Sequence, residues 1–103
     1  MFDEKLKAVY PLLAAPAPDG WVKLKVLFQH EDGMDQLNTY YKVESSNDWI
    51  EKAYGGFDLL DFYDSIKGDI DIKKYPQIEI VFDKEKNMEY RFIEDYPDLF
   101  DGN

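Results

Sequence analysis

Five aspartates lie within fourteen residues of the chain, and Lys67 is the only basic residue among them. The first three recur at every third position, a spacing that places them on one face of a helix. Such a surface favours a cationic partner, because complementary charge speeds encounter and disfavours wrong partners. A solvated face that only aids solubility is the alternative interpretation. We call this set the acidic ridge; its members are Asp58, Asp61, Asp64, Asp69 and Asp71.

Two aromatic residues precede or adjoin the acidic ridge, Tyr54 and Phe57. Aromatic side chains that lose their water on binding supply much of the affinity of protein interfaces. On a helical wheel Phe57 falls on the same side as the aspartates rather than on the apolar side. We therefore predict that Tyr54 and Phe57 anchor a partner that the acidic ridge attracts.

A second acidic cluster surrounds His30, the single histidine of the chain. Its carboxylates are Glu31, Asp32 and Asp35, in a polar segment that contains Gly33. Loops present such groups well to partners, so this cluster is a second candidate surface. It lacks the glycine and the final glutamate that calcium-binding loops place at fixed positions. We predict no metal site and expect His30 to be a solvated side chain near a hairpin tip.

Residues for covalent catalysis are scarce. The chain has no cysteine, which removes thiolate nucleophiles, disulfides and zinc–thiolate sites together. A serine–histidine pair would have to join His30 to Ser45, Ser46 or Ser65, and no motif supports one. The pair Gly55-Gly56 lacks the lysine and hydroxyl residue of a phosphate-binding loop. We predict no catalytic residue and no cofactor, with a hydrolase that uses paired carboxylates as an alternative.

The overall charge narrows the classes of partner. The chain has 103 residues, with 22 acidic side chains against 12 basic ones, so its formal net charge is −10. A surface of this charge repels phosphate backbones and anionic membrane faces. We therefore expect no nucleic acid and no membrane among its partners, and a basic protein fits. The absence of cysteine suits the reducing cytoplasm. We interpret the apolar segment 6–17 as structural rather than as a signal peptide.

Apolar periodicity predicts the elements that must position these residues. With 45% hydrophobic residues the chain has enough apolar material for one folded domain over residues 1–103. Period-two alternation favours strands, and three- and four-residue spacing favours helices. The expected helices cover residues 2–15, with a bend at Pro11, and 58–66, ended by Gly68. The expected strands cover residues 21–29, 37–43, 78–82 and 88–92, with 30–36 as a loop.

This order of elements predicts an α+β fold. Two β-hairpins form an antiparallel sheet, and the N-terminal helix and the central helix cover one of its faces. The opposite face of the sheet is expected to meet water. If the alternation continues without a break, Trp21, Tyr40 and Ile93 point to that open face.

The order of short motifs along nearly the whole chain resembles that of the YezG-like immunity proteins, which accompany bacterial polymorphic toxins. The motifs that carry the resemblance are Tyr10-Pro11, Pro18-Asp19-Gly20-Trp21, Tyr40-Tyr41, Tyr75-Pro76-Gln77-Ile78-Glu79-Ile80 and Met88-Glu89-Tyr90. The resemblance implies a small cytoplasmic protein that binds and neutralises a cognate toxin, commonly a nuclease. A small cytosolic ligand-binding or adaptor domain with incidental negative charge is the alternative function.

Overall fold

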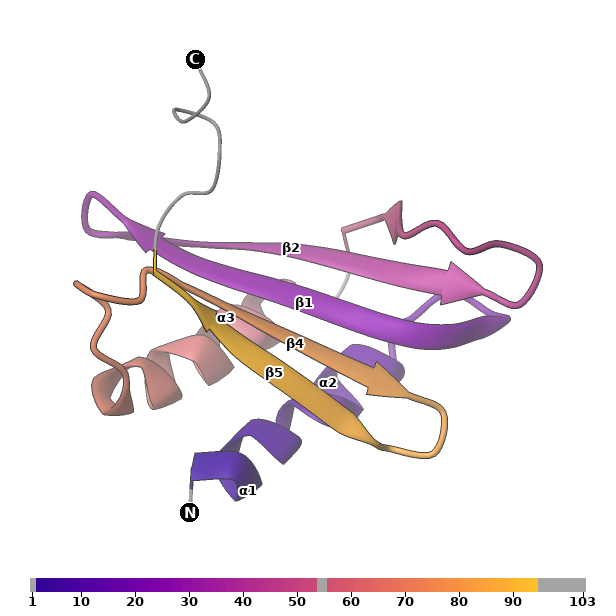
Figure 1. Ribbon diagram of the computed structural model, residues 1–103, viewed down its shortest axis with the longest axis horizontal. Coiled ribbons are helices and arrows are strands. Elements are labelled where there is room, and N and C mark those ends of the chain that lie inside the picture. Colours follow the sequence, from indigo (N-terminus) through magenta and orange to yellow (C-terminus); the bar gives the residue numbers. More distant parts are fainter. Residues whose placement is uncertain (1, 54–55, 95–103) are drawn as a thin grey trace.

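The structure is a computed structural model that describes residues 2–53 and 56–94. Its strands form one five-stranded antiparallel sheet in the order β3-β2-β1-β4-β5, and the helices pack on one face of that sheet (Figure 1). The α+β prediction is therefore confirmed. The predicted anchor Tyr54 and the acidic segment 95–103 lie outside the described residues. Among the described residues, no helix combines the length and apolar character needed to cross a bilayer.

The N-terminal segment forms two short helices, α1 (Phe2–Lys7) and α2 (Val9–Ala14). The predicted single helix is thus interrupted at Ala8, earlier than the expected bend at Pro11. Pro11 has no N–H group to donate to the carbonyl of Lys7, four residues before it, so the helical ladder breaks at that turn. The Ala8 N–H instead donates to the Lys5 carbonyl at 3.2 Å. The buried residues of the two helices still share one face: Leu6, Val9 and Leu13.

The first hairpin consists of β1 (Trp21–Glu31) and β2 (Met34–Val43), and its strands are longer than predicted. The loop expected over residues 30–36 is wrong, since only Asp32 and Gly33 connect the two strands. Both residues have positive φ, 54° and 77°, as a two-residue turn of the I′ type requires. The Asp-Gly pair thus allows the pairing of β1 and β2 to continue to the tip of the hairpin.

A β-bulge near the start of β1 changes which way Trp21 faces. Trp21 pairs with Val43 and Lys23 pairs with Lys42, so Val22 is an extra residue in the ladder. The extra residue reverses the alternation before it, and Trp21 is only 8% exposed. The prediction that Trp21 points to the open face is therefore wrong.

The central part of the chain contains a strand that periodicity did not predict. This short strand, β3 (Ile50–Glu51), pairs with Tyr40 and Tyr41 of β2. It is followed by α3 (Gly56–Ile66) and by a short 3-10 helix, η1 (Lys67–Asp69). Gly68 lies inside η1 with no positive φ, so the expected glycine cap at the end of α3 is wrong.

The second hairpin, β4 (Gln77–Asp83) and β5 (Met88–Ile93), forms as predicted. Strand β4 pairs with β1, which places β1 at the centre of the sheet. The inward side chains of the two central strands pack against the helices and complete the core. These side chains are Leu24, Val26, Phe28, Ile78, Ile80 and Phe82.

Candidate functional site

Helix α3 presents an exposed aromatic side chain beside carboxylates. Its buried face contains Leu59, Phe62, Tyr63 and Ile66, and 3.6 residues per turn place Phe57 on the far side. Phe57 is 84% exposed, the largest value among the exposed large apolar side chains that the structure describes. Asp61 and Asp64 follow it four and seven residues later, so all three share one stripe along the helix.

The acidic ridge is divided in the structure rather than continuous. Asp58 lies on the other flank of α3, beside a surface cavity that Pro11, Leu12, Ala15 and Pro16 also line. This separation follows from the 100° turn per residue, which moves Asp58 away from the Asp64 side of the helix.

The two aspartates after the helix do not extend the stripe. The Asp69 carboxylate forms an ion pair of 2.6 Å with Lys5 of α1. Asp71 accepts the main-chain N–H of Lys74 at 3.3 Å, within the following turn. The expectation of five carboxylates on one surface is corrected accordingly. Among the described residues, Asp58, Asp61 and Asp71 are the ridge members in no ion pair, and of these Asp58 and Asp61 belong to α3.

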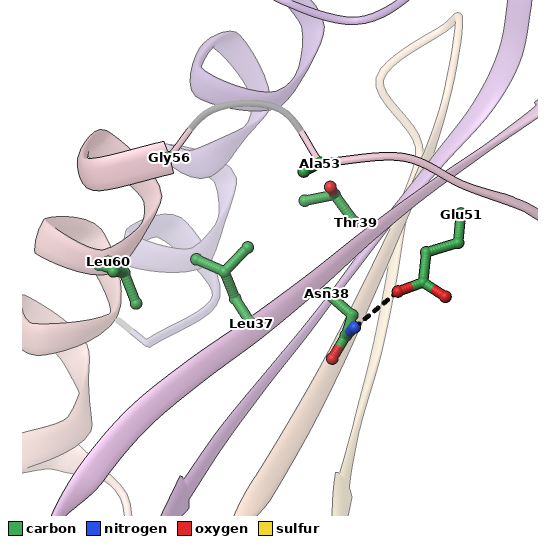
Figure 2. Close-up of a pocket in the computed structure, with 7 residues that line it drawn as sticks. All are labelled: Leu37, Asn38, Thr39, Glu51, Ala53, Gly56 and Leu60. Carbon is green, nitrogen blue, oxygen red and sulfur yellow. Dashed lines mark hydrogen bonds between the residues drawn. The ribbon is translucent and has the colours of Figure 1, made fainter.

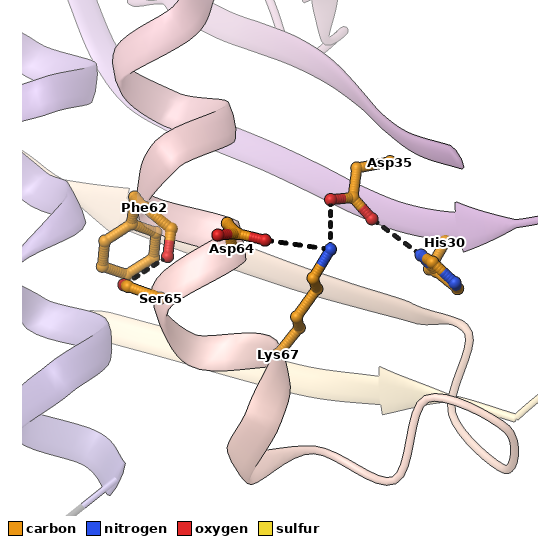
Figure 3. Close-up of polar contacts among 6 residues, drawn as sticks. All are labelled: His30, Asp35, Phe62, Asp64, Ser65 and Lys67. Carbon is orange, nitrogen blue, oxygen red and sulfur yellow. Dashed lines mark hydrogen bonds and ion pairs between the residues drawn. The ribbon is translucent and has the colours of Figure 1, made fainter. Parts of the chain in front are cut away.

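Lys67 joins the acidic ridge to the second candidate surface (Figure 3). Its ammonium group lies 3.0 Å from Asp64 and 2.6 Å from Asp35. Asp35 in turn contacts Nδ1 of His30 at 2.7 Å. The two regions that the sequence presented as separate sites therefore meet at the end of α3.

His30 and Asp35 do not belong to a solvated loop. They are direct partners across the hairpin, and their side chains point to the face of the sheet that α3 covers. The expectation of a free solvated histidine at the tip is therefore wrong, and the reason is the longer ladder. Glu31 and Asp32 remain exposed at the tip itself.

The contact between Asp35 and Lys67 shifts the pKa values of these two groups in opposite directions. Burial by itself would raise the pKa of Asp35, but the hydrogen bonds with Lys67 and His30 outweigh it and lower that pKa. The hydrogen bonds with Asp35 and Asp64 raise the pKa of Lys67. Both shifts favour the charged forms, so Asp35 and Lys67 are ionised at neutral pH.

Replacing Asp35 with asparagine is expected to lower the free energy of unfolding by about 1–2 kcal/mol at pH 7, because hydrogen bonds to charged partners are lost. The folded-state pKa of Asp35 is below its ordinary value of 3.8. The contribution of the Asp35 charge to the free energy of unfolding is therefore complete above that value. It disappears as the pH falls through the folded-state pKa. Urea unfolding at pH 7 and pH 3 should show the Asp35→Asn difference shrinking in acid.

Asp32→Asn is the matched control for this prediction. It removes a carboxylate from the same hairpin, but at an exposed turn position with positive φ that asparagine accepts. We expect a change within about 0.5 kcal/mol, independent of pH. Equal effects of the two substitutions would contradict a stabilising role for the Lys67 network.

A cavity of about 330 Å³ lies between β2, β3 and the start of α3 (Figure 2). Leu37 and Leu60 give it apolar walls from the strand and the helix. Among the described residues that line it, Glu51 is the one carboxylate, and that group accepts a hydrogen bond of 2.8 Å from Asn38. The described lining thus lacks the pair of carboxylates that glycoside hydrolysis uses. Sequence reasoning missed it because β3 was not predicted.

Within residues 2–53 and 56–94, no cluster of three or more His, Asp or Glu side chains is arranged to hold a metal ion. No protein-family model matches the sequence, and no curated protein matches it either. The candidate site therefore depends on its own geometry: an exposed phenylalanine beside carboxylates, next to a network that links α3 to the first hairpin.

Proposed function

We propose that this chain is a cytoplasmic immunity protein that binds a cognate secreted toxin, a nuclease with a basic active-site cleft, and neutralises it. The observation that supports the proposal best is the exposure of Phe57 on the acidic side of α3. Covering a phenylalanine that is 84% exposed on this chain lowers the free energy of the complex. The neighbouring carboxylates make a cationic surface the complementary partner.

The charge of the chain agrees with this class of partner. Nuclease clefts are basic because they hold phosphates. The positive potential of such a cleft attracts an acidic protein as it attracts the nucleic acid. Asp61 follows Phe57 on the same stripe of α3 and Asp58 lies on the neighbouring flank; among the described residues neither is in an ion pair, so their charges are available to a partner. The resemblance to YezG-like immunity proteins supports the same role.

The test is co-expression with the basic C-terminal module of a toxin gene next to the gene for this chain. We expect toxicity to disappear and the two proteins to purify as a stoichiometric complex. Phe57→Ala should weaken the complex about 30-fold or more, the size typical of a central aromatic anchor. Phe57→Trp is the matched control, since it keeps an aromatic ring at the position and should retain binding.

Persistence of toxicity, with no complex formed by the native chain, would refute the proposed function. A complex that Phe57→Ala leaves unchanged would show that the toxin binds elsewhere. The alternative, a ligand-binding or adaptor domain with incidental charge, is favoured by the cavity of about 330 Å³ near Leu37, which is within the size range of small-molecule sites. Such a domain would leave the toxicity unchanged.

A further inference from the structure

Strand β2 has an edge that is only partly paired. Among the described residues, β3 pairs with β2 at Tyr40 and Tyr41, and the N–H of Lys52 extends the ladder by donating to Thr39 at 3.0 Å. Within residues 2–53 and 56–94, the sheet order places no other strand on this side of β2. The first five residues of β2, 34–38, therefore form an open edge about 16 Å long at 3.3 Å per residue.

The main-chain groups along this edge can be assigned from the ladder. Because the Thr39 carbonyl faces β3, alternation makes the N–H and carbonyl groups of Leu37 and Asp35 face the same side. The two-residue turn after Glu31 gives the same result, since it directs the main-chain groups of Met34 toward β1 and those of Asp35 away from it. Two residues thus present four hydrogen-bonding groups outward.

The cavity beside β2 lies where the chain leaves the sheet after Lys52 (Figure 2). An added strand that continued the line of β3 would place one side chain opposite Leu37. That side chain would point toward the helices, where Leu37, Ala53 and Leu60 line the cavity. The site therefore combines a main-chain ladder with a side-chain pocket, the two parts of peptide recognition by strand addition.

Charge decides which occupant fits. The edge is flanked by Glu51 on the β3 side, and Asp35 within it lies close to Asp64 of α3, since Lys67 contacts both carboxylates. A second copy of this chain would bring the same carboxylates together and would carry another net charge of −10. An extended basic segment is attracted by the same groups.

We propose that the 34–38 edge of β2 binds an extended, basic segment of the partner protein by strand addition, with an apolar side chain of that segment in the cavity between Leu37 and Leu60. This inference rests on the proposed function in that it takes the partner to be a basic protein. It adds the mode of contact: the partner lengthens the sheet while its cationic surface covers Phe57.

The other edge of the sheet provides an internal comparison. Among the described residues, strand β5 pairs only with β4, and its inward aromatic side chains pack against α1, although Phe92 remains 36% exposed. Phe2 packs on Tyr90 and Phe92 with ring centroids 6.2 and 5.9 Å apart. Among the described residues, the cavity of about 310 Å³ on this side is lined mostly by charged side chains, those of Glu79, Glu89 and Arg91, whereas Leu37 and Leu60 give the cavity beside β2 apolar walls.

The experiment measures amide hydrogen exchange of the full chain by NMR with the peptide Lys-Val-Lys-Val-Lys-Val at low salt. We expect the exchange of the Leu37 and Asp35 amides to slow at least tenfold. The amides of Gln36 and Asn38, which already face β1, should change little. The peptide Glu-Val-Glu-Val-Glu-Val should protect neither pair.

Two variants test the pocket without touching the ladder. Ala53→Trp fills the cavity from an exposed position and should weaken peptide binding at least tenfold. Ala8→Trp adds the same bulk at the exposed turn between α1 and α2 and should have no effect. The unfolding midpoint of each variant, measured alongside, shows that both remain folded.

Several results would overturn the proposal. These are no protection of Leu37 and Asp35 at a saturating peptide concentration, protection confined to β5, equal binding of the acidic peptide, or protection that rises with protein concentration alone, which would identify a second copy as the occupant. None of these depends on a toxin. The failure of strand addition is therefore distinguishable from the failure of the immunity function, which the co-expression test decides.

Discussion

Replacing Phe28 with alanine is expected to lower the free energy of unfolding by about 3–5 kcal/mol. Phe28 is fully buried on β1 and stacks on Tyr63 of α3, with ring centroids 4.9 Å apart and ring planes 4° from parallel. It also contacts Phe62, at 6.0 Å between centroids. The ring therefore connects the central strand to the helix that presents Phe57, and its loss leaves a cavity at that contact.

Urea unfolding of Phe28→Ala and Phe57→Ala measures this effect against a matched control. Both remove the same ring, but Phe57 is 84% exposed and its replacement should change stability by less than about 0.5 kcal/mol. A domain of this size has a total stability of about 5–15 kcal/mol, so Phe28→Ala removes a large part of it. A loss below about 1 kcal/mol for Phe28→Ala would contradict the packing between β1 and α3.

Reversing the charge of Asp58 and Asp61 together is expected to slow association with a basic partner at least about tenfold at low ionic strength. These two carboxylates follow Phe57 by one and four residues on α3, and among the described residues neither is in an ion pair. The variant Asp58→Lys/Asp61→Lys changes the net charge from −10 to −6. Because salt screens exposed charges over about 10 Å at 0.1 M and 3 Å at 1 M, the difference should diminish as salt is added.

The matched control is Glu44→Lys/Glu85→Lys, which produces the same net charge at exposed positions in the turns after β2 and β4. Stopped-flow association with the toxin module should separate the two variants. We expect the control to associate within about threefold of the native rate, since its charges lie away from α3. If both variants slow association equally, only the overall charge acts and α3 is an ordinary solvated helix.

Phe57 shows what periodicity was able to predict about the site. Leu59, Phe62, Tyr63 and Ile66 recur at helical spacing, and that spacing alone places Phe57 with the aspartates on the open side. The two hairpins were predictable for the same kind of reason, since alternation is visible within each strand. In both cases the signal lies within a few neighbouring residues.

The inward orientation of Trp21 and the cavity beside β2 could not be predicted from periodicity. Val22 and Trp21 are both apolar, so the sequence contains no mark of the bulge that turns Trp21 inward. Strand β3 has only two residues, too few for alternation to appear. The cavity and the open edge of β2 follow from β3, so they could not be predicted either.

The sequence by itself determined the α+β class, the strong negative charge and the exposure of Phe57, because composition and periodicity are local properties of the chain. The tertiary structure alone decided that the acidic ridge divides and that Lys67 joins Asp35 to Asp64. Lys67 and Asp35 are 32 positions apart, and no local pattern relates them. Their contact exists because the core packs α3 across the first hairpin, which brings the end of the helix to the His30–Asp35 pair.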